Sequence, residues 1–229
     1  MMNVVKVFST SQKMASIRRY SSIHLLKEES VLEHTGFVCM FTYLVCLELN
    51  AFDTYVDLGK ALSRAVIHDV DEVVTGDIPR PTKYFDSDSI KIFKKISEVG
   101  ISSLIKEMDA SDNVQMKLRE DWENSKKDNE GMIVALADLA SVVYKLWDEV
   151  ILLGNKKMMM QCSDVDDYIS DYLKLLKSSK FDREQVKVIE RICSDLKIIC
   201  DKIMKEESPL HGTFSSNLRK EVNYEHLLS

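Results

Sequence analysis

The segment 65–81 concentrates ionisable side chains within an otherwise apolar run of residues. His68 and Asp69 are adjacent, Glu72 follows within one helical turn, and Asp77 stands directly after a glycine. Because an uncompensated buried charge is costly, so many ionisable groups in an apolar helix indicate a chemical use. Adjacent histidine and aspartate side chains can reach one metal ion, and on a continuous helix Glu72 shares their face. The segment therefore predicts half of a metal site that activates water.

The other half of such a site must come from elsewhere in the chain, and two residues stand out. His34 lies early in one apolar stretch, and Asp138 lies in 132–140, the most apolar run of the sequence. A carboxylate in such a run must either protonate or find a cation. With His68 and Asp69, these residues offer two imidazoles and two carboxylates. That set suits one divalent ion (Co, Mn, Zn, Fe or Mg) and leaves coordination positions for water and substrate.

Several of these candidate residues also have a simpler, structural interpretation. A lone buried histidine such as His34 is more often a hydrogen-bonded core residue than a metal ligand. The His68–Asp69 pair would look the same as a structural ion pair, and Asp77 can be a turn residue after Gly76. The metal hypothesis depends on the set as a whole.

Helical patterns provide the frame for these residues. Ser30 and Glu33 match a capping box, which predicts the start of a helix that runs to about Asn50. Pro79 and Pro81 prevent the helix that carries His68 and Asp69 from continuing. The predicted helices cover residues 30–50, 57–76, 87–108, 112–125, 129–153, 164–177 and 182–206.

The composition favours a single all-α domain. The chain has 229 residues, of which 45% are hydrophobic, and only 7 glycines and 3 prolines. So few turn-forming residues argue for long helices, and no segment shows the period-two alternation of a strand. We predict a single-domain helical bundle over residues 1–206, with a motif core at about 17–154. Residues 207–229 are predicted to be a C-terminal tail or docking arm.

Charge, cysteine content and hydropathy limit the partners and the compartment. The net charge of −6 argues against a broad nucleic-acid surface, but allows a small anionic substrate near a metal and a few basic groups. The five cysteines are odd in number and lack a CxxC pair, which indicates reduced thiols and a cytoplasmic protein. No apolar stretch is expected to be long enough to span a membrane. Met158–Met160 is a candidate subunit interface of a homo-oligomer.

The order and spacing of His34, the His68–Asp69 doublet and Asp138 resemble the H…HD…D pattern of the HD-domain phosphohydrolases. The likeness is closer to the bacterial 5′-deoxynucleotidases, whose corresponding stretches are similar to 30–34 and to 68–85, which contains EVVTGDIPRP. It extends from the N-terminus to about Gly154. The resemblance implies an all-α HD-type fold and metal-dependent hydrolysis of deoxynucleoside 5′-monophosphates to deoxynucleoside and phosphate.

The resemblance also implies roles for particular residues. It makes His34, His68, Asp69 and Asp138 the metal ligands, and gives Glu72 and Asp77 the catalytic roles around the attacking water and the leaving alkoxide. Arg19 matches a phosphate-binding arginine, and Tyr20 stands where those enzymes usually have a tryptophan beside the nucleotide. Lys83, which follows the proline-rich turn, is a further candidate for the phosphate.

Two other functions compete with the monophosphatase. Some phage enzymes on the same scaffold hydrolyse deoxynucleoside triphosphates to nucleoside and triphosphate, and the motif cannot separate the two reactions. The acidic chain favours the monophosphate, since only Arg18, Arg64 and Arg80 are nearby in sequence as further cations. The third hypothesis is an inactive helical module that binds a nucleotide or a protein. Glu72 and Asp77 argue against it, because a pure binder needs neither.

Overall fold

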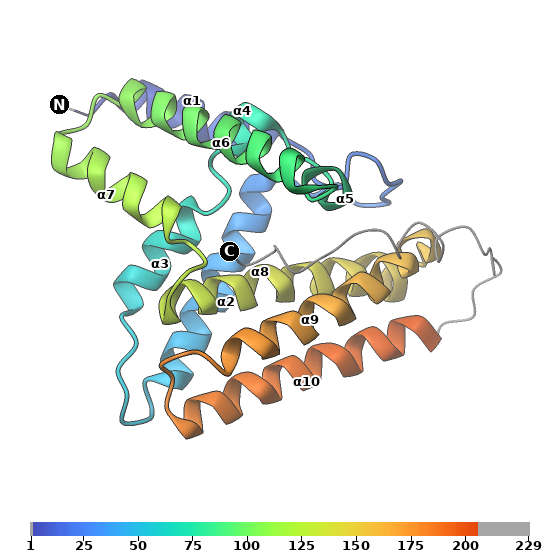
Figure 1. Cartoon of the computed structure of the whole chain (residues 1–229). Coiled ribbons are helices and arrows are strands. Elements are labelled where there is room, and N and C mark those ends of the chain that lie inside the picture. The colour runs from blue at the N-terminus through green and yellow to red at the C-terminus, as the bar shows by residue number, and fades with distance from the viewer. Residues whose placement is uncertain (1, 206–229) are drawn as a thin grey trace.

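The computed structural model describes residues 2–205, and these residues form an all-α protein (Figure 1). Within them the one contact of strand type is an isolated antiparallel bridge between Arg18 and Ser30. The predicted tail at 207–229 lies outside the described residues. The helices are α1 (Val4–Ser16), α2 (Val31–Leu49), α3 (Leu58–Ile67), α4 (Glu72–Thr75), α5 (Arg80–Lys83), α6 (Ser87–Glu107), α7 (Asp112–Glu123), α8 (Asn129–Trp147), α9 (Cys162–Leu176) and α10 (Arg183–Lys205).

Helix α2 is the centre of the bundle and begins where the sequence predicts. The Ser30 hydroxyl accepts the Glu33 N–H at 3.2 Å, and the Glu33 carboxylate accepts the Ser30 N–H at 2.7 Å, so the predicted capping box is present. The helix packs against α3 and α8 and buries Val38 and Leu49 completely. This packing places His34, one turn from the helix start, in the protein interior.

Helix α2 is also long and apolar enough to cross a membrane by length and composition, which corrects the expectation that no stretch qualifies. A core helix that is apolar on most of its surface passes the same test, and α2 contacts both α3 and α8. Its hydropathy is therefore weak evidence for a membrane span. Its outer face nevertheless leaves Met40, Leu44 and Leu47 about half or more exposed.

The helix predicted over 57–76 is interrupted at the His68–Asp69 doublet, contrary to the sequence prediction. Helix α3 ends at Ile67, and α4 begins at Glu72. Between them, amides bond to carbonyls three residues back, as from Val70 to Ile67 (3.2 Å) and from Glu72 to Asp69 (3.1 Å). The ionisable residues therefore lie on a tight turn rather than on one helix face. His68 and Asp71 on this turn are buried, whereas Asp69 and Glu72 are partly exposed.

Gly76 ends α4 and turns the chain toward α5. Its φ of 71° lies in the left-handed region, where residues with a Cβ are strained. As predicted, the prolines prevent the helix from continuing, although Arg80–Lys83 forms one separate helical turn.

The C-terminal half builds the larger part of the core. After Trp147, α8 continues as a π-helical turn (Asp148–Leu152), and α9 and α10 pack along α8 (Figure 1). Met158 and Met159 are 0% and 6% exposed within this core. The prediction that Met158–Met160 is a subunit interface is therefore wrong for Met158 and Met159, because a short 3-10 turn packs them inward.

Helix α1 was not predicted from the sequence. The Asn3 side chain caps it by accepting the Lys6 N–H, and Met14 packs in a small cluster with Val31 and Ile67. The helix thereby fixes one end of the loop that leads into α2.

Candidate active site

His34, His68 and Asp69 form a compact cluster of potential metal ligands. The two histidine Nε2 atoms are 3.2 Å apart, and Asp69 Oδ2 lies 3.2 Å from His34 Nε2 and 3.1 Å from His68 Nε2. Asp138 Oδ1, from α8, lies 3.3 Å from His34 Nε2. Ligand atoms about 2.0–2.1 Å from a tetrahedral ion lie roughly 3.3 Å from one another. His34, His68 and Asp69 therefore fit one divalent ion, and Asp138 borders the same cluster through its contact with His34.

Hydrogen bonds on the far side of each imidazole leave both Nε2 lone pairs directed at this cluster. His68 Nδ1 lies 2.8 Å from the Ala65 carbonyl, which can only accept, so Nδ1 carries the proton. His34 Nδ1 lies 3.0 Å from the Ser141 hydroxyl, which already donates to the Asp138 carbonyl at 2.6 Å. His34 Nδ1 is therefore also the donor. Two facing lone pairs repel each other unless a proton or a metal cation lies between them and Asp69, and this arrangement suits metal ligands.

The surrounding charges keep the two aspartates ionised. Burial alone would raise the pKa of Asp69, but His68 and His34 lower it well below its usual range. Burial also opposes the ionisation of Asp138, whereas Lys126 and His34 lower its pKa well below the usual range. Both side chains can therefore serve as anionic ligands at neutral pH.

Glu72 lies beside the cluster in a different electrostatic environment. Burial, followed by the negative charges of Asp69 and Asp77, raises the pKa of Glu72 to about 10. Its Oε2 atom is buried and has no hydrogen-bond partner within residues 2–205. A positive charge bound among the neighbouring aspartates would oppose this shift, which couples the protonation of Glu72 to the metal site. Such coupling is typical of groups that exchange protons during catalysis.

A cavity of about 310 Å³ opens onto this cluster. His34 and His68 lie beneath its wall with side chains that are 0% exposed. The loop between α1 and α2, the α3–α5 segment, α8 and α9 surround it. The structure thus brings all the predicted site residues together. The cavity is lined by the other predicted residues, namely Asp69, Asp138, Glu72, Asp77, Arg19, Tyr20 and Lys83.

The loop between α1 and α2 carries Arg19 and Tyr20 into the cavity. Tyr20 has a φ of 57°, a conformation that is rare for a bulky residue, and its N–H donates to Asp77 Oδ2 at 2.7 Å. Asp77 therefore fixes this loop as well as lining the cavity. Arg19 Nη1 forms a long ion pair with Glu29 at 3.6 Å. Arg19 Nη1 and the Tyr20 hydroxyl are buried and have no hydrogen-bond partner in the described structure.

A buried polar cluster holds the other side of this loop. The Glu149 carboxylate, which is fully buried, accepts the N–H groups of Leu26 and Lys27 at 2.9 Å each. It also accepts hydrogen bonds from Lys145 at 2.9 Å and Asn155 at 2.6 Å. The π-helical turn after α8 places Glu149 in this position. The loop between α1 and α2 is thus fastened to the end of α8.

Replacing Glu149 with alanine should destabilise the protein by about 3–5 kcal/mol, because the buried Lys145 ammonium loses its charge partner. Burial would raise the pKa of Glu149, but bonds from Asn155, Leu26 and Lys145 lower it from 4.5 to about 2. A lowered pKa stabilises the fold above pH 4.5, and the contribution disappears as the pH falls toward 2. Urea denaturation at pH 7 and pH 3 would measure both effects.

The matched control is Glu28→Ala on the same loop. Glu28 pairs with Arg18 at the surface, with 74% of its side chain exposed, so its loss should change the stability by less than about 1 kcal/mol. Equal stability losses in the two variants would contradict the anchoring role of Glu149.

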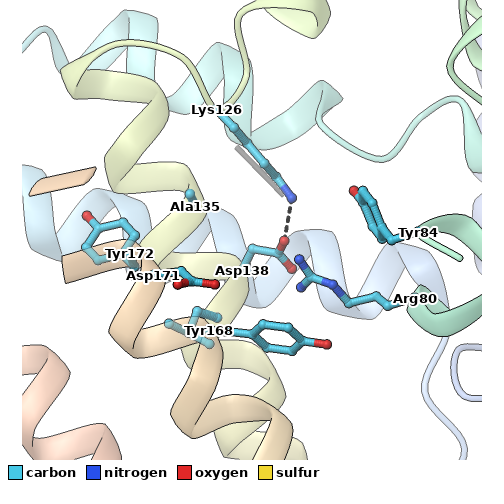
Figure 2. A pocket seen from close by; sticks show the side chains of 9 residues that line it. Arg80, Tyr84, Lys126, Ala135, Asp138, Tyr168, Asp171 and Tyr172 are labelled. Carbon is cyan, nitrogen blue, oxygen red and sulfur yellow. Dashed lines mark hydrogen bonds and ion pairs between the residues drawn. The ribbon is translucent and has the colours of Figure 1, made fainter. Parts of the chain in front are cut away.

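The site also contains residues that the sequence analysis did not assign to it. Ser141 orients His34, and Lys126 Nζ lies 2.5 Å from Asp138 Oδ2. Figure 2 shows Arg80 beside Asp138, with its guanidinium carbon 4.2 Å from the centre of the Tyr168 ring. Ser141 could have been found from its spacing of three residues from Asp138 in an apolar helix. Lys126 and Tyr168 lie outside any recognisable motif.

Comparison with known proteins identifies relatives of this amino-acid sequence over most of its length. Residues 6–189 match the family model described as 5′-deoxynucleotidase YfbR-like, so the similarity extends well beyond the predicted limit at Gly154. The chain is 29% identical over 140 residues to a 5′-deoxynucleotidase of Shewanella oneidensis, an alignment covering 61% of this chain and 64% of that relative. It is 27% identical over 159 residues to the 5′-deoxynucleotidase YfbR of Escherichia coli, covering 67% and 76%.

Solved structures share the fold at lower sequence identity. An HD-domain phosphohydrolase from Listeria innocua has a TM-score of 0.64 and 16% identity, and the match covers 90% of this chain and all of that one. A cyanophage S-2L HD phosphohydrolase, solved with dA and one catalytic Zn²⁺ ion, has a TM-score of 0.56 and 14% identity over 85% of this chain and 96% of that one. The all-α prediction is confirmed, and the chain belongs to the YfbR-like 5′-deoxynucleotidase family, with the fold of the HD-domain phosphohydrolases.

Proposed function

We propose that this protein is a metal-dependent 5′-deoxynucleotidase that releases phosphate from deoxynucleoside 5′-monophosphates. One observation carries the proposal: three buried polar atoms around the cavity, Arg19 Nη1, Tyr20 Oη and Glu72 Oε2, have no hydrogen-bond partner in the described structure. Buried polar groups are normally paired, so these atoms are suited to a polar ligand. Family membership supports a nucleotide as that ligand.

The residues around the cavity have distinct roles in this reaction. His34, His68, Asp69 and Asp138 would hold a divalent ion, which when bound polarises a phosphoryl oxygen and lowers the pKa of water. Glu72 accepts a proton from the attacking water, since its Oε2 has no other partner. Asp77 takes up a proton from solvent on the carboxyl oxygen that does not hold Tyr20 and passes it to the departing 5′ oxygen.

The remaining residues bind the substrate. Arg19 Nη1 and Lys83 neutralise the phosphate, and the Tyr20 ring and hydroxyl form the wall beside the nucleoside. Burial raises the pKa of Tyr20 to about 12, so the hydroxyl stays neutral and can donate a hydrogen bond. The named cyanophage structure, which contains dA, supports a deoxynucleoside at the corresponding place.

Hydrolysis of deoxynucleoside triphosphates is the second candidate, and the cations of the cavity favour it. Arg80 and Lys126 line the cavity together with Arg19 and Lys83, which is more positive charge than the sequence indicated. Arg18 and Arg64, by contrast, pair with Glu28 and Asp128 outside the cavity lining. The family match nevertheless favours the monophosphate.

Product analysis separates the two reactions. The metal-loaded protein should release inorganic phosphate from dAMP and other deoxynucleoside monophosphates, and release no triphosphate from dATP. Ion chromatography of the products would detect either anion. Triphosphate from any deoxynucleoside triphosphate, without phosphate from the monophosphates, would make the second candidate correct. Neither product, from protein with full metal content, would favour the inactive binding module.

We further propose Co, Mn, Zn, Fe or Mg as the resident divalent ion, a cytoplasmic location and a homo-oligomeric state. The His/Asp ligand set supports the transition metals in particular. The exposed apolar residues Met40, Leu44 and Leu47 on α2 support association of two copies, because contiguous exposed apolar surface commonly marks an interface. Elemental analysis and light scattering would measure the metal and the oligomeric state.

A further inference from the structure

Lys126 reaches the candidate metal site from outside the helices that build it. The residue lies in the connection between α7 and α8, and its Nζ atom lies 2.5 Å from Asp138 Oδ2 (Figure 2). The other oxygen, Asp138 Oδ1, lies 3.3 Å from His34 Nε2. One carboxylate therefore lies between the metal cluster on one side and an ammonium group on the other.

The backbone of this connection is held close to the start of α8. A Cβ atom on Gly131 would lie 2.8 Å from the Lys126 carbonyl carbon and 2.9 Å from the Asn124 oxygen, so glycine alone allows this approach. Asp128 accepts the Gly131 N–H at 3.0 Å and also binds Arg64, which is 3% exposed. The position at which the Lys126 side chain begins is therefore fixed.

The Lys126 side chain, by contrast, has room to move. It is 38% exposed and has a flexible four-carbon stem. It lines both the main cavity and an adjoining cavity of about 80 Å³, which Arg80 and Tyr168 also border. Arg80 is stacked on the Tyr168 ring. An ammonium group beside this guanidinium, facing open space, is suited to phosphate oxygens.

A divalent ion at the cluster would change the balance of charge around Lys126. Without the ion, Asp138 is the nearest anion to the ammonium. A divalent ion held by His34, Asp69 and Asp138 would place two positive charges beside the Asp138 carboxylate. These charges would repel the Lys126 ammonium, which pairs with the same carboxylate. A phosphate bound in the main cavity, which Lys126 also lines, would then be the better partner for the ammonium.

We propose that Lys126 is a phosphate-binding residue that competes with the divalent ion for Asp138. The ammonium pairs with Asp138 in the metal-free protein and turns to the phosphoryl oxygens of the substrate once the ion binds. The identity of the substrate rests on the proposed function, whereas the competition for Asp138 and the binding of phosphate do not.

The test compares Lys126→Met with Lys127→Met, whose exposed side chain is not in the lining of either cavity. Calorimetry would measure Co²⁺ binding to the metal-free proteins and inorganic phosphate binding to the Co²⁺-loaded proteins. Lys126→Met should bind Co²⁺ more tightly, because a competing cation is gone. It should bind phosphate more weakly by about 10-fold or more, as expected for the loss of a charged hydrogen bond. Lys127→Met should match the wild type in both measurements.

Tighter Co²⁺ binding together with weaker phosphate binding would distinguish a phosphate-binding lysine from one that only supports the fold. Weaker Co²⁺ binding by Lys126→Met would mean that the lysine only positions Asp138, and unchanged phosphate binding would remove it from the phosphate site; either result overturns the proposal. Lys126→Arg should retain phosphate binding within a few-fold, which shows that a loss in Lys126→Met reflects charge rather than misfolding. Because the probes are Co²⁺ and inorganic phosphate, the result stands even if deoxynucleoside monophosphates prove not to be substrates.

Discussion

Replacement of His68 or Asp69 with alanine should abolish both metal binding and phosphate release. Each side chain is in contact with the others of the cluster at 3.1–3.2 Å, so the loss of one leaves an open coordination position and an unbalanced charge. Loss of a residue that merely supports a ligand typically costs about 10–100-fold in metal affinity, and loss of a ligand should cost more. Elemental analysis after dialysis should find about one ion per wild-type chain and none in either variant.

Asp71→Asn provides the matched control for this experiment. Asp71 is a buried aspartate of the same turn, but its carboxylate accepts a hydrogen bond from the Trp122 indole at 3.0 Å and is not part of the metal cluster. An asparagine can still accept that bond, so the metal content should remain that of the wild type. Full metal occupancy in both His68→Ala and Asp69→Ala would disprove the ligand assignment.

Replacement of Glu72 with glutamine should separate catalysis from metal binding. The side chain lies beside the cluster, lines the cavity and has a buried oxygen with no hydrogen-bond partner in the described structure, but unlike Asp69 and Asp138 it makes no ion pair with His34 or His68. The glutamine keeps the shape and loses the ability to accept a proton. The turnover should fall by a factor of about 10²–10⁴, as is typical for loss of a general base, while metal content and thermal stability stay close to those of the wild type.

Glu98→Gln, on the exposed surface of α6, should keep the wild-type turnover and controls for the charge change itself. Rates must be compared at equal metal content per chain. Wild-type turnover in fully metal-loaded Glu72→Gln would exclude Glu72 from proton transfer, and loss of metal would make it a ligand instead.

The sequence predicted the helices best where local signals and burial agree. The capping box of Ser30 and Glu33 marks the start of α2, and the apolar run around Asp138 marks α8. Helix α1 was missed because its residues 4–16 are rich in valine, serine and threonine, which are weak helix formers. The interruption after Ile67 was missed because the apolar pattern continues through it, although the amides there bond to carbonyls three residues back instead of four.

The site residues were predictable when they belonged to the motif and unpredictable when the fold supplied them from elsewhere. Lys126 comes from a polar connection in which lysine is ordinarily solvated. The close packing at Gly131 fixes its backbone beside the start of α8. Glu149 likewise depends on a π-helical turn that no sequence pattern signalled. Such contacts arise from tertiary packing, and a single sequence contains no periodic signal for them.

The loop from Ile17 to Val31 has a consequence for how this scaffold can diverge. Its two ends are tied together by the Arg18–Ser30 bridge and by the bond from the Val31 N–H to the Ile17 carbonyl at 3.1 Å. In a loop closed in this way, doubling the length costs only about 0.6 kcal/mol in closure entropy. Insertions near Ser22, between the points at which Tyr20 and Leu26 are held, can therefore reshape this side of the cavity without moving His34 on α2 or Asp138 on α8. Length changes at this point can therefore accumulate while Tyr20 stays bonded to Asp77 and the metal cluster stays in place.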